Sequence, residues 1–479
     1  MILAILIIGL ILRLISLNQS LWLDEAINVL ASKNYSFLAM IAEYAKGDFH
    51  PPGWFIILWF WTKLFGYSEV AVRIPSVIFG VISIYVTYLI GKKLISKEVG
   101  IIAALIMCLN PLHIYYSQEA RMYSLATLVV AINIYLFIKL IKQEKINYFY
   151  FILSNFLVLM SDYVAYFIFP AELMVLFLMG KIASPRQRRG LAMTWVGCLI
   201  VSIILSIWWL PTFLGQLNVG SVASANLPTW KFVLGTFDIK AIPLTYIKFI
   251  IGRISYPDKL IYGLILLPIS ILYLFLLIYG IKTLRSIERS LILCWLLIPI
   301  ILASFVSLFI PIYSYFRVLY VLPAFVILLA VGISVLKTKL KYGVVFIVIL
   351  IELFACSVYL FNPAFHREDW KGLVSFLKSK KPAVVLFESS GTLSPFDYYA
   401  KKDLNGKGAL KDFPAKQDQD IIDLENLLKD QKEVYLVNYL VQISDPDRLV
   451  AKKLIKLGYQ QAETKDFTGL GFLYHYVLR

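Results

Sequence analysis

Long apolar segments alternate with short polar loops through the first three quarters of the chain. A helix of about 17 to 25 mostly apolar residues is long enough to cross the roughly 30 Å hydrocarbon core of a bilayer. Segments near this length predict about 11 transmembrane helices, at residues 1–17, 73–91, 99–116, 122–141, 146–161, 163–180, 191–210, 260–280, 290–310, 317–336 and 342–361. Residues 1–17 have no basic leader and no small-residue cleavage site, which predicts a retained first helix.

Residues 54–65 form one more apolar segment, which is short, rich in tryptophan and interrupted by Lys63. The positive-inside rule places the basic loops in the cytoplasm, and it permits either a spanning or an interfacial 54–65. These basic loops lie near residues 92–97, 139–145, 181–189, 282–289 and 337–341. Only an interfacial 54–65 puts the first polar loop, 18–72, on the same extracytoplasmic side as the later polar motifs, so we favour that arrangement.

The composition excludes an ordinary soluble protein. Hydrophobic residues make up 60% of the chain and charged residues 16%, whereas soluble domains are typically about 25% charged. The formal net charge of +16 belongs mainly to the cytoplasmic loops, so we expect no nucleic-acid partner. The four cysteines each lie inside an apolar run without CxxC spacing, which is typical of small buried side chains.

The composition changes abruptly at about residue 362, where charged residues become frequent. We therefore expect a transmembrane module, 1–361, followed by a small extracytoplasmic α/β domain, 362–479. Its predicted helices are 367–379, 421–428 and 446–457, and its predicted strands are 383–387, 433–438 and 471–478. In the membrane module, the loop 211–258 is long; its four prolines argue against one continuous helix, and Trp230 with Phe232 suggests an interfacial piece.

Two adjacent carboxylates, Asp24 and Glu25, follow the first apolar segment beside Trp22, a residue suited to the membrane interface. A partly desolvated carboxylate at such a place can act as a general base, so both residues are catalytic candidates. The alternative is structural: Asp24 precedes the helical run 25–32 and could cap its N-terminus.

His50 precedes Pro51 and Pro52, which fix the start of the tryptophan-rich helix. His50 could bind a phosphate or orient a carboxylate, or it could be an incidental exposed side chain at the turn. Asp24, Asp48 and His50 form a weak candidate site for a divalent cation, although their spacing matches no metal motif. We expect no other cofactor.

A second polar cluster lies at residues 115–123, between two predicted helices. Ionisable residues at the ends of membrane helices are functional candidates, and an arginine can bind phosphate in a bidentate manner. We therefore expect Tyr116, Glu119, Arg121 and Tyr123 to contribute to a substrate site. A purely structural ion pair between Glu119 and Arg121 is the alternative.

Three more arginines, Arg73, Arg253 and Arg317, lie at the outer ends of predicted helices. Arg317 is flanked by tyrosines, including Tyr315, a polar and aromatic lining suited to a sugar phosphate. The alternative for each arginine is a side chain that merely reaches from the helix end to water.

Taken in order, these motifs resemble the GT-C superfamily of polyprenyl-phosphate-dependent glycosyltransferases, of the family 39 and family 83 type. That group includes protein O-mannosyltransferases and lipid A aminoarabinose transferases. The matching features are the pair Asp24-Glu25, His50-Pro51-Pro52, the stretch 64–69 running into Arg73-Ile74-Pro75-Ser76, the stretch 117–123, and Arg317 with Leu322-Pro323-Ala324. The resemblance covers about residues 1–336, and the C-terminal domain matches in its placement and in the opening Arg367-Glu368-Asp369-Trp370.

The resemblance implies an inverting transfer of a sugar from a lipid-linked phosphate to a hydroxyl group of a lipid, glycan or protein, at the outer face of the plasma membrane. Asp24 matches the catalytic base. The phosphate that leaves needs fixed positive charge, for which Arg121 and Arg317 are the best candidates, followed by His50 and Arg73. A histidine before the paired prolines departs from the aminoarabinose transferases, and the β-trefoil insert of eukaryotic protein mannosyltransferases is absent from the sequence.

Two other functions fit the sequence less well. A flippase or transporter of lipid-linked sugars usually has inverted repeats or charges at mid-membrane, whereas here the polar residues gather at one rim. A scaffold whose α/β domain recruits partners leaves the carboxylate and arginine clusters unexplained.

Overall fold

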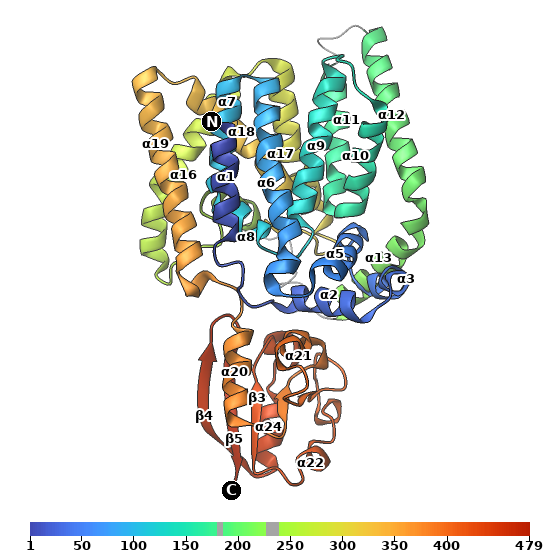
Figure 1. Ribbon diagram of the computed structural model, residues 1–479, viewed down its shortest axis with the longest axis vertical. Helices are drawn as coiled ribbons and strands as arrows, with labels where there is room; N and C mark the ends of the chain where they lie inside the picture. The colour runs from blue at the N-terminus through green and yellow to red at the C-terminus, as the bar shows by residue number, and fades with distance from the viewer. Residues whose placement is uncertain (180–184, 227–238) are drawn as a thin grey trace.

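The structure is a computed structural model that describes residues 1–179, 185–226 and 239–479. It consists of a bundle of helices with a small α/β domain at one end, and the chain's N-terminus lies at the opposite end of the bundle (Figure 1). The predicted fold class, a polytopic helical protein with a C-terminal α/β domain, is confirmed.

Helices occupy every segment that the apolar pattern selects. They are α1 (Ile2–Leu14), α6 (Glu69–Leu94), α7 (Lys97–Leu109), α8 (Pro111–Ser117), α9 (Tyr123–Ile141), α10 (Tyr148–Ser161), α11 (Ile168–Leu178), α12 (Pro185–Ser206), α16 (Lys259–Thr283), α17 (Ser286–Val306), α18 (Leu322–Ser334) and α19 (Thr338–Phe361). Among the described residues, 6 helices are long and apolar enough to cross a membrane, or 7 if a bent pair counts as one span. The chain is a multi-pass membrane protein.

Several predicted spans are shorter or less regular than the apolar pattern suggests. The segments 1–17, 146–161, 163–180 and 317–336 contain helices of 10–17 residues. The predicted helix 99–116 is two helices, α7 and α8, that meet at 62°. Pro111 has no N–H to donate and disfavours helical backbone at Asn110. Asn110 therefore ends α7 and caps α8, accepting a hydrogen bond from the His113 N–H at 3.0 Å.

The first polar loop folds into α2 (Leu23–Asn34), α3 (Phe37–Ala39), α4 (Ala45–Gly47) and α5 (Gly53–Phe65). Figure 1 shows α2, α3 and α5 together at the end of the bundle that faces the α/β domain. The long loop carries α13 (Leu210–Asn226) and α15 (Ala241–Ile251), and the suggested interfacial piece at Trp230 and Phe232 lies outside the described residues.

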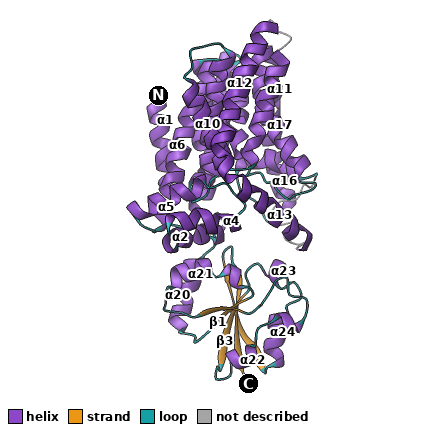
Figure 2. Ribbon diagram, turned by 90° about the vertical axis from the view of Figure 1, so that its right-hand side faces the viewer, coloured by secondary structure: helices purple, strands orange, loops and turns teal. Residues whose placement is uncertain are grey.

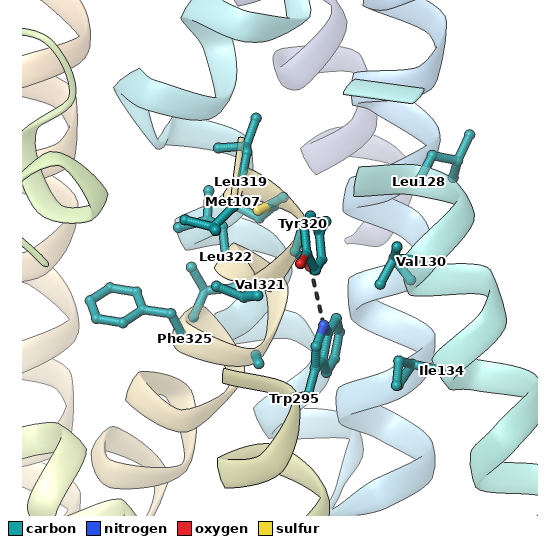
Figure 3. Close-up of a cluster of buried hydrophobic side chains, with 14 of the residues drawn as sticks. Met107, Leu128, Val130, Ile134, Trp295, Leu319, Tyr320, Val321, Leu322 and Phe325 are labelled. Atoms are coloured by element: carbon teal, nitrogen blue, oxygen red, sulfur yellow. Dashed lines mark hydrogen bonds between the residues drawn. The ribbon is translucent and has the colours of Figure 1, made fainter. Parts of the chain in front are cut away.

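The interior of the bundle is close-packed around α9, α17 and α18. Trp295 of α17 is 1% exposed and donates its indole N–H to the carbonyl of Tyr320 at 3.1 Å (Figure 3). Small residues let α16 approach α18 closely, since a Cβ at Gly332 would lie 2.0 Å from the Leu276 carbonyl oxygen. Such close approach is typical of helix pairs in membranes, where van der Waals contact drives association.

The C-terminal domain is a five-stranded sheet with helices on both faces (Figure 2). Its strands are β1 (Val385–Phe387), β2 (Gly406–Gly408), β3 (Glu433–Val437), β4 (Tyr459–Phe467) and β5 (Gly471–Leu478), in the order β2-β1-β3-β5-β4. Its helices are α20 (Trp370–Lys380), α21 (Ser394–Ala400), α22 (Leu424–Leu427), α23 (Val441–Ser444) and α24 (Leu449–Lys456). β1 pairs in parallel with β2 and β3, so the carboxyl ends of these strands share one edge.

Candidate active site

Asp24 lies at the second residue of α2, since the N-cap position is Trp22. The interpretation of Asp24 as the cap of this helix is therefore wrong. Its side chain is 37% exposed, and its Oδ2 lies 3.4 Å from Nη2 of Arg121, which is itself only 4% exposed. A carboxylate open to a reactant but fixed by a buried arginine is well placed to accept a proton.

Asp48 and His50 lie on the other side of the Arg121 guanidinium. His50 Nδ1 is 2.5 Å from Asp48 Oδ1, and Arg121 Nη1 is 4.0 Å from Asp48 Oδ2. Burial alone would raise the pKa of Asp48, but His50, Arg121 and the N–H of Phe49 outweigh it and lower the pKa to about 2. Asp48 therefore carries a negative charge that holds His50 and Arg121 in place.

The same geometry bears on the weak cation site suggested at Asp24, Asp48 and His50. Within the described parts of the chain, no three side chains of histidine, cysteine, aspartate or glutamate converge as a metal site. The guanidinium of Arg121 lies between the two carboxylates and supplies positive charge at that position.

Glu25 differs from its neighbour, because it is fully buried. Arg73 donates hydrogen bonds to both carboxylate oxygens of Glu25, at 2.9 and 2.6 Å. The N–H of Ala120 also donates to Oε1 of Glu25, at 2.7 Å. Burial raises the pKa of Glu25, but the charges of Arg73 and Arg367 have a larger effect in the opposite direction. The net shift of the pKa is therefore downward. The prediction of a catalytic Glu25 is corrected: its oxygens are engaged by the protein and closed to a reactant.

The prediction that Arg73 binds the donor phosphate is also corrected, because its guanidinium is buried and engaged by the protein. Besides Glu25, its guanidinium donates to the carbonyl oxygens of Leu17, Gln19 and Ser20 at 2.7–2.9 Å, and the residue is 1% exposed. It fastens the turn between α1 and α2 to α6, so it positions Asp24 and has no donor left for a phosphate.

Replacing Glu25 by glutamine is expected to cost about 2 kcal/mol of stability, because a charged hydrogen-bond acceptor to a buried arginine is lost while the shape is kept. Sugar transfer per folded molecule should change little. Thermal unfolding in detergent measures the first effect. The matched control is Glu98→Gln, which removes a 51% exposed carboxylate from its pair with Lys341 and should cost less than about 1 kcal/mol. Equal losses for both variants would contradict this role of Glu25.

Glu119 pairs with an arginine of the α/β domain, so the alternative of a structural ion pair with Arg121 is wrong. Arg367 Nη1 donates to Glu119 Oε2 at 2.9 Å, while Nη2 donates to the carbonyl oxygens of Tyr115 and Gln118 at 3.1 Å. The guanidinium carbon also lies 4.3 Å from the centre of the Tyr115 ring. Glu119 Oε1 is buried without a hydrogen-bond partner among the described residues.

An aromatic wall joins the remaining predicted residues. The ring of Tyr116 lies 5.2 Å from that of Tyr123, and Phe316 lies 5.6 and 5.2 Å from these two rings. Arg253 donates to the Tyr115 hydroxyl, and Tyr123 lies within electrostatic range of both Arg121 and Arg317.

Tyr315 continues the aromatic wall, with its ring 5.4 Å from that of Phe316. Arg317 donates to the Ile312 carbonyl oxygen at 3.5 Å. In the described part of the chain, the buried Nε atoms of Arg121 and Arg317 have no hydrogen-bond partner, so both arginines keep donors that a phosphate could use.

The α/β domain also contacts the residue that precedes Asp24. Glu368 accepts hydrogen bonds from the Trp370 indole at 2.8 Å, the Tyr439 hydroxyl at 2.7 Å and the N–H of Leu23, the residue before Asp24. Burial raises the pKa of Glu368 to about 7, and the charge of Asp24 adds to the effect.

In the sequence, Arg367 and Glu368 stand out only as the opening of the last domain. Arg367 does follow the last membrane helix, as Arg253 and Arg317 adjoin theirs. An arginine next to the end of a membrane helix was therefore the signal by which Arg367 could have been predicted as a site residue. Nothing in the sequence pointed to Tyr439.

Comparison with known proteins finds a family match that covers part of this site. Residues 49–209 match the family model described as dolichyl-phosphate-mannose-protein mannosyltransferase. An uncharacterized protein of Aquifex aeolicus is 24% identical over 298 residues, which cover 62% of this chain and 56% of that relative. The matched region thus spans little more than half the length of the relative.

Solved structures share the whole architecture. ArnT from Cupriavidus metallidurans, bound to undecaprenyl phosphate, aligns with a TM-score of 0.56 and 12% identity over 99% of this chain and 97% of its own. AglB from Archaeoglobus fulgidus, in complex with an inhibitory peptide and a dolichol-phosphate, aligns with a TM-score of 0.55 and 12% identity over 99% and 74%. The predicted resemblance to the GT-C superfamily is confirmed.

Proposed function

We propose that this chain is an inverting glycosyltransferase that moves a sugar from a polyprenyl-phosphate donor to a hydroxyl group of a lipid, glycan or protein. The observation that carries the proposal is the arrangement of the half-exposed Asp24 beside the buried Arg121. The family match of residues 49–209 to mannosyltransferases that use dolichyl phosphate mannose supports it. So does the undecaprenyl phosphate or dolichol-phosphate bound by the structural neighbours.

In this reaction, Asp24 accepts the proton of the acceptor hydroxyl while the hydroxyl oxygen bonds to the anomeric carbon. The bond from that carbon to the phosphate oxygen breaks on the opposite face, and its electron pair leaves with the polyprenyl phosphate. The leaving group gains negative charge, so fixed cations nearby lower the barrier. Arg121 and Arg317, whose Nε atoms have no hydrogen-bond partner among the described residues, and Arg253 beside Tyr115 would supply that charge.

The other residues of the site position Asp24 and Arg121 for these two roles. Asp48 and His50 hold Arg121, while Glu25 and Arg73 hold the helix that carries Asp24. We place the site and the α/β domain on the extracytoplasmic side of the plasma membrane, because the basic loops gather at the other end of the bundle.

The proposal is tested by incubating the purified protein with a panel of radiolabelled polyprenyl-phosphate sugars and acceptors, with and without a chelator. Transfer of label to an acceptor from at least one donor is expected. The chelator arm decides whether a divalent cation takes part. Movement of the labelled donor between vesicle leaflets without any transfer would replace the proposal with the transporter function.

Replacing Arg121 by glutamine should weaken donor binding by roughly 10- to 100-fold, the equivalent of one lost charged hydrogen bond. Binding of polyprenyl phosphate, measured by displacement of a labelled donor, gives the result. Lys46→Gln is the matched control, since Lys46 is an exposed cation in the same loop as Asp48. Unchanged donor affinity in the Arg121 variant would remove it from the phosphate site.

A further inference from the structure

A cavity of about 550 Å³ opens at the end of the helix bundle away from the candidate active site. It is lined by the last residues of α6 and α9 and by the first residues of α17: Lys93, Leu94, Ile95, Ile141, Lys142, Arg285, Ser286, Ile287 and Glu288. Arg121 lies just before α9 and the cavity at its other end, so the 19-residue helix separates the two by roughly 28 Å. In Figure 1 this is the end of the bundle that is remote from the α/β domain.

The cavity wall combines cations with aliphatic side chains. Lys93, Lys142 and Arg285 contribute three positive charges against the single carboxylate of Glu288 in the lining. The other lining side chains are mostly leucine and isoleucine. A wall of this kind suits a ligand that is anionic at one end and apolar at the other.

The cations are held by weak partners that an anion could replace. Lys142 Nζ donates to the carbonyl oxygen of Lys93 at 2.7 Å, and Lys93 pairs with Glu144. Arg285 Nε lies 3.5 Å from Glu288 Oε1, and the Arg285 side chain is 87% exposed. An ion pair whose cation is as exposed as Arg285 typically contributes less than about 1 kcal/mol. Arg285 also precedes the first turn of α17, whose N–H groups favour a negative charge.

We propose that this cavity binds the phosphate group of an anionic phospholipid, with the acyl chains lying along its isoleucine and leucine side chains. Three apolar helices begin or end here, so the cavity lies where the membrane surface is expected. Basic pockets between membrane helices are established sites for anionic lipid headgroups, and the cavity volume falls in the range of small-molecule sites, about 300 to 1,000 Å³. The site is separate from the proposed reaction, so either proposal can fail alone.

The test measures the thermal stability and lipid binding of the full-length protein in neutral detergent. Phosphatidylglycerol, phosphatidylcholine and inorganic phosphate are titrated separately. We expect phosphatidylglycerol to bind and raise the melting temperature, and phosphatidylcholine to do neither. In the double variant Lys142→Gln and Arg285→Gln, affinity for phosphatidylglycerol should fall about 25-fold, because each basic group near an anionic lipid contributes about fivefold.

The matched control replaces Lys282 and Arg289 by glutamine, two exposed cations at the same end of the bundle that do not line the cavity. This variant should bind phosphatidylglycerol as the unmodified protein does. Equal weakening in both double variants would overturn the site in favour of general surface charge, and equal binding of both lipids would overturn the need for an anion. If inorganic phosphate binds with the same dependence on Lys142 and Arg285, the cavity is a phosphate site. Its ligand is then soluble phosphate and not a lipid headgroup.

Discussion

Replacing Asp24 by asparagine is expected to lower the rate of sugar transfer by about 10²- to 10⁴-fold, the usual contribution of a positioned general base. Asparagine keeps the size of the side chain but cannot accept the proton of the acceptor hydroxyl. Arg121 retains Asp48 as a neighbour, so donor binding should stay within a few-fold. Single-turnover transfer, with donor affinity measured separately, gives the two quantities.

Glu43→Gln is the control for this prediction, because Glu43 is an exposed carboxylate in the same first loop. It should transfer sugar at the unmodified rate. Transfer by the Asp24 variant at the rate of the Glu43 variant would remove Asp24 from the chemistry. A loss that is explained by weaker donor binding alone would make Asp24 a partner of Arg121 and not the base.

The apolar pattern predicted the helices well, because every residue of a membrane helix meets the same demand for a satisfied backbone and an apolar surface. It predicted their ends less well. Asn110 and Pro111 divide one predicted helix into α7 and α8, which meet at 62°. The capping side chain of Asn110 and the conformational limits of Pro111 mark that break in the sequence.

The site was predictable where its residues are close in sequence. Asp24 follows the first apolar segment, and Asp48 with His50 adjoins a proline turn. The pairing of charges was not predictable, because it is made over long distances along the chain. A structural ion pair between Glu119 and Arg121, two residues away, was the alternative to a substrate role. The partner of Glu119 is instead Arg367, which is 248 residues away. Two residues that are close in sequence at a turn can point in different directions, so their closeness does not predict that their side chains meet.

The α/β domain shows the same limit. β5 was predicted at residues 471–478, where the structure has it, because its apolar residues are plain in the sequence. β4, β2 and α21 were not predicted, and the expected helix at 421–428 is reduced to α22. β4 is exposed along most of its length, so its residues form a polar run. Its pairing with β5 creates the strand, and that pairing lies outside any local pattern.

The domain is fastened to the first loop at several points, which ties its position to that of Asp24. The Tyr399 hydroxyl accepts from the Leu21 N–H at 2.7 Å, and the Tyr398 hydroxyl donates to the Tyr67 carbonyl oxygen at 2.6 Å. Lys371 pairs with Glu69 at 2.8 Å. These contacts are half-buried, whereas Arg367 is 1% exposed at its side chain, so Arg367 is the contact with the largest expected effect.

Replacing Arg367 by glutamine is expected to cost about 3 to 5 kcal/mol of stability, the usual effect of removing one member of a buried ion pair. The change leaves Glu119 with a buried, unpaired charge and frees the carbonyl oxygens of Tyr115 and Gln118. Burial already raises the pKa of Glu119, and the charge of Arg367 opposes that effect. The lost cation should therefore show as a lower melting temperature in detergent and as faster proteolysis between the bundle and the α/β domain.

Two further variants separate this role from a general weakening of the interface. Lys371→Gln removes a 43% exposed cation from the same interface and should cost less than about 1 kcal/mol. Adding Glu119→Gln to the Arg367 variant should recover part of the lost stability, because the unpaired charge is then gone. If the Arg367 and Lys371 variants are equally stable, Arg367 does not hold the domain. If Glu119→Gln gives no recovery, the cost comes from the freed carbonyl groups and not from the charge.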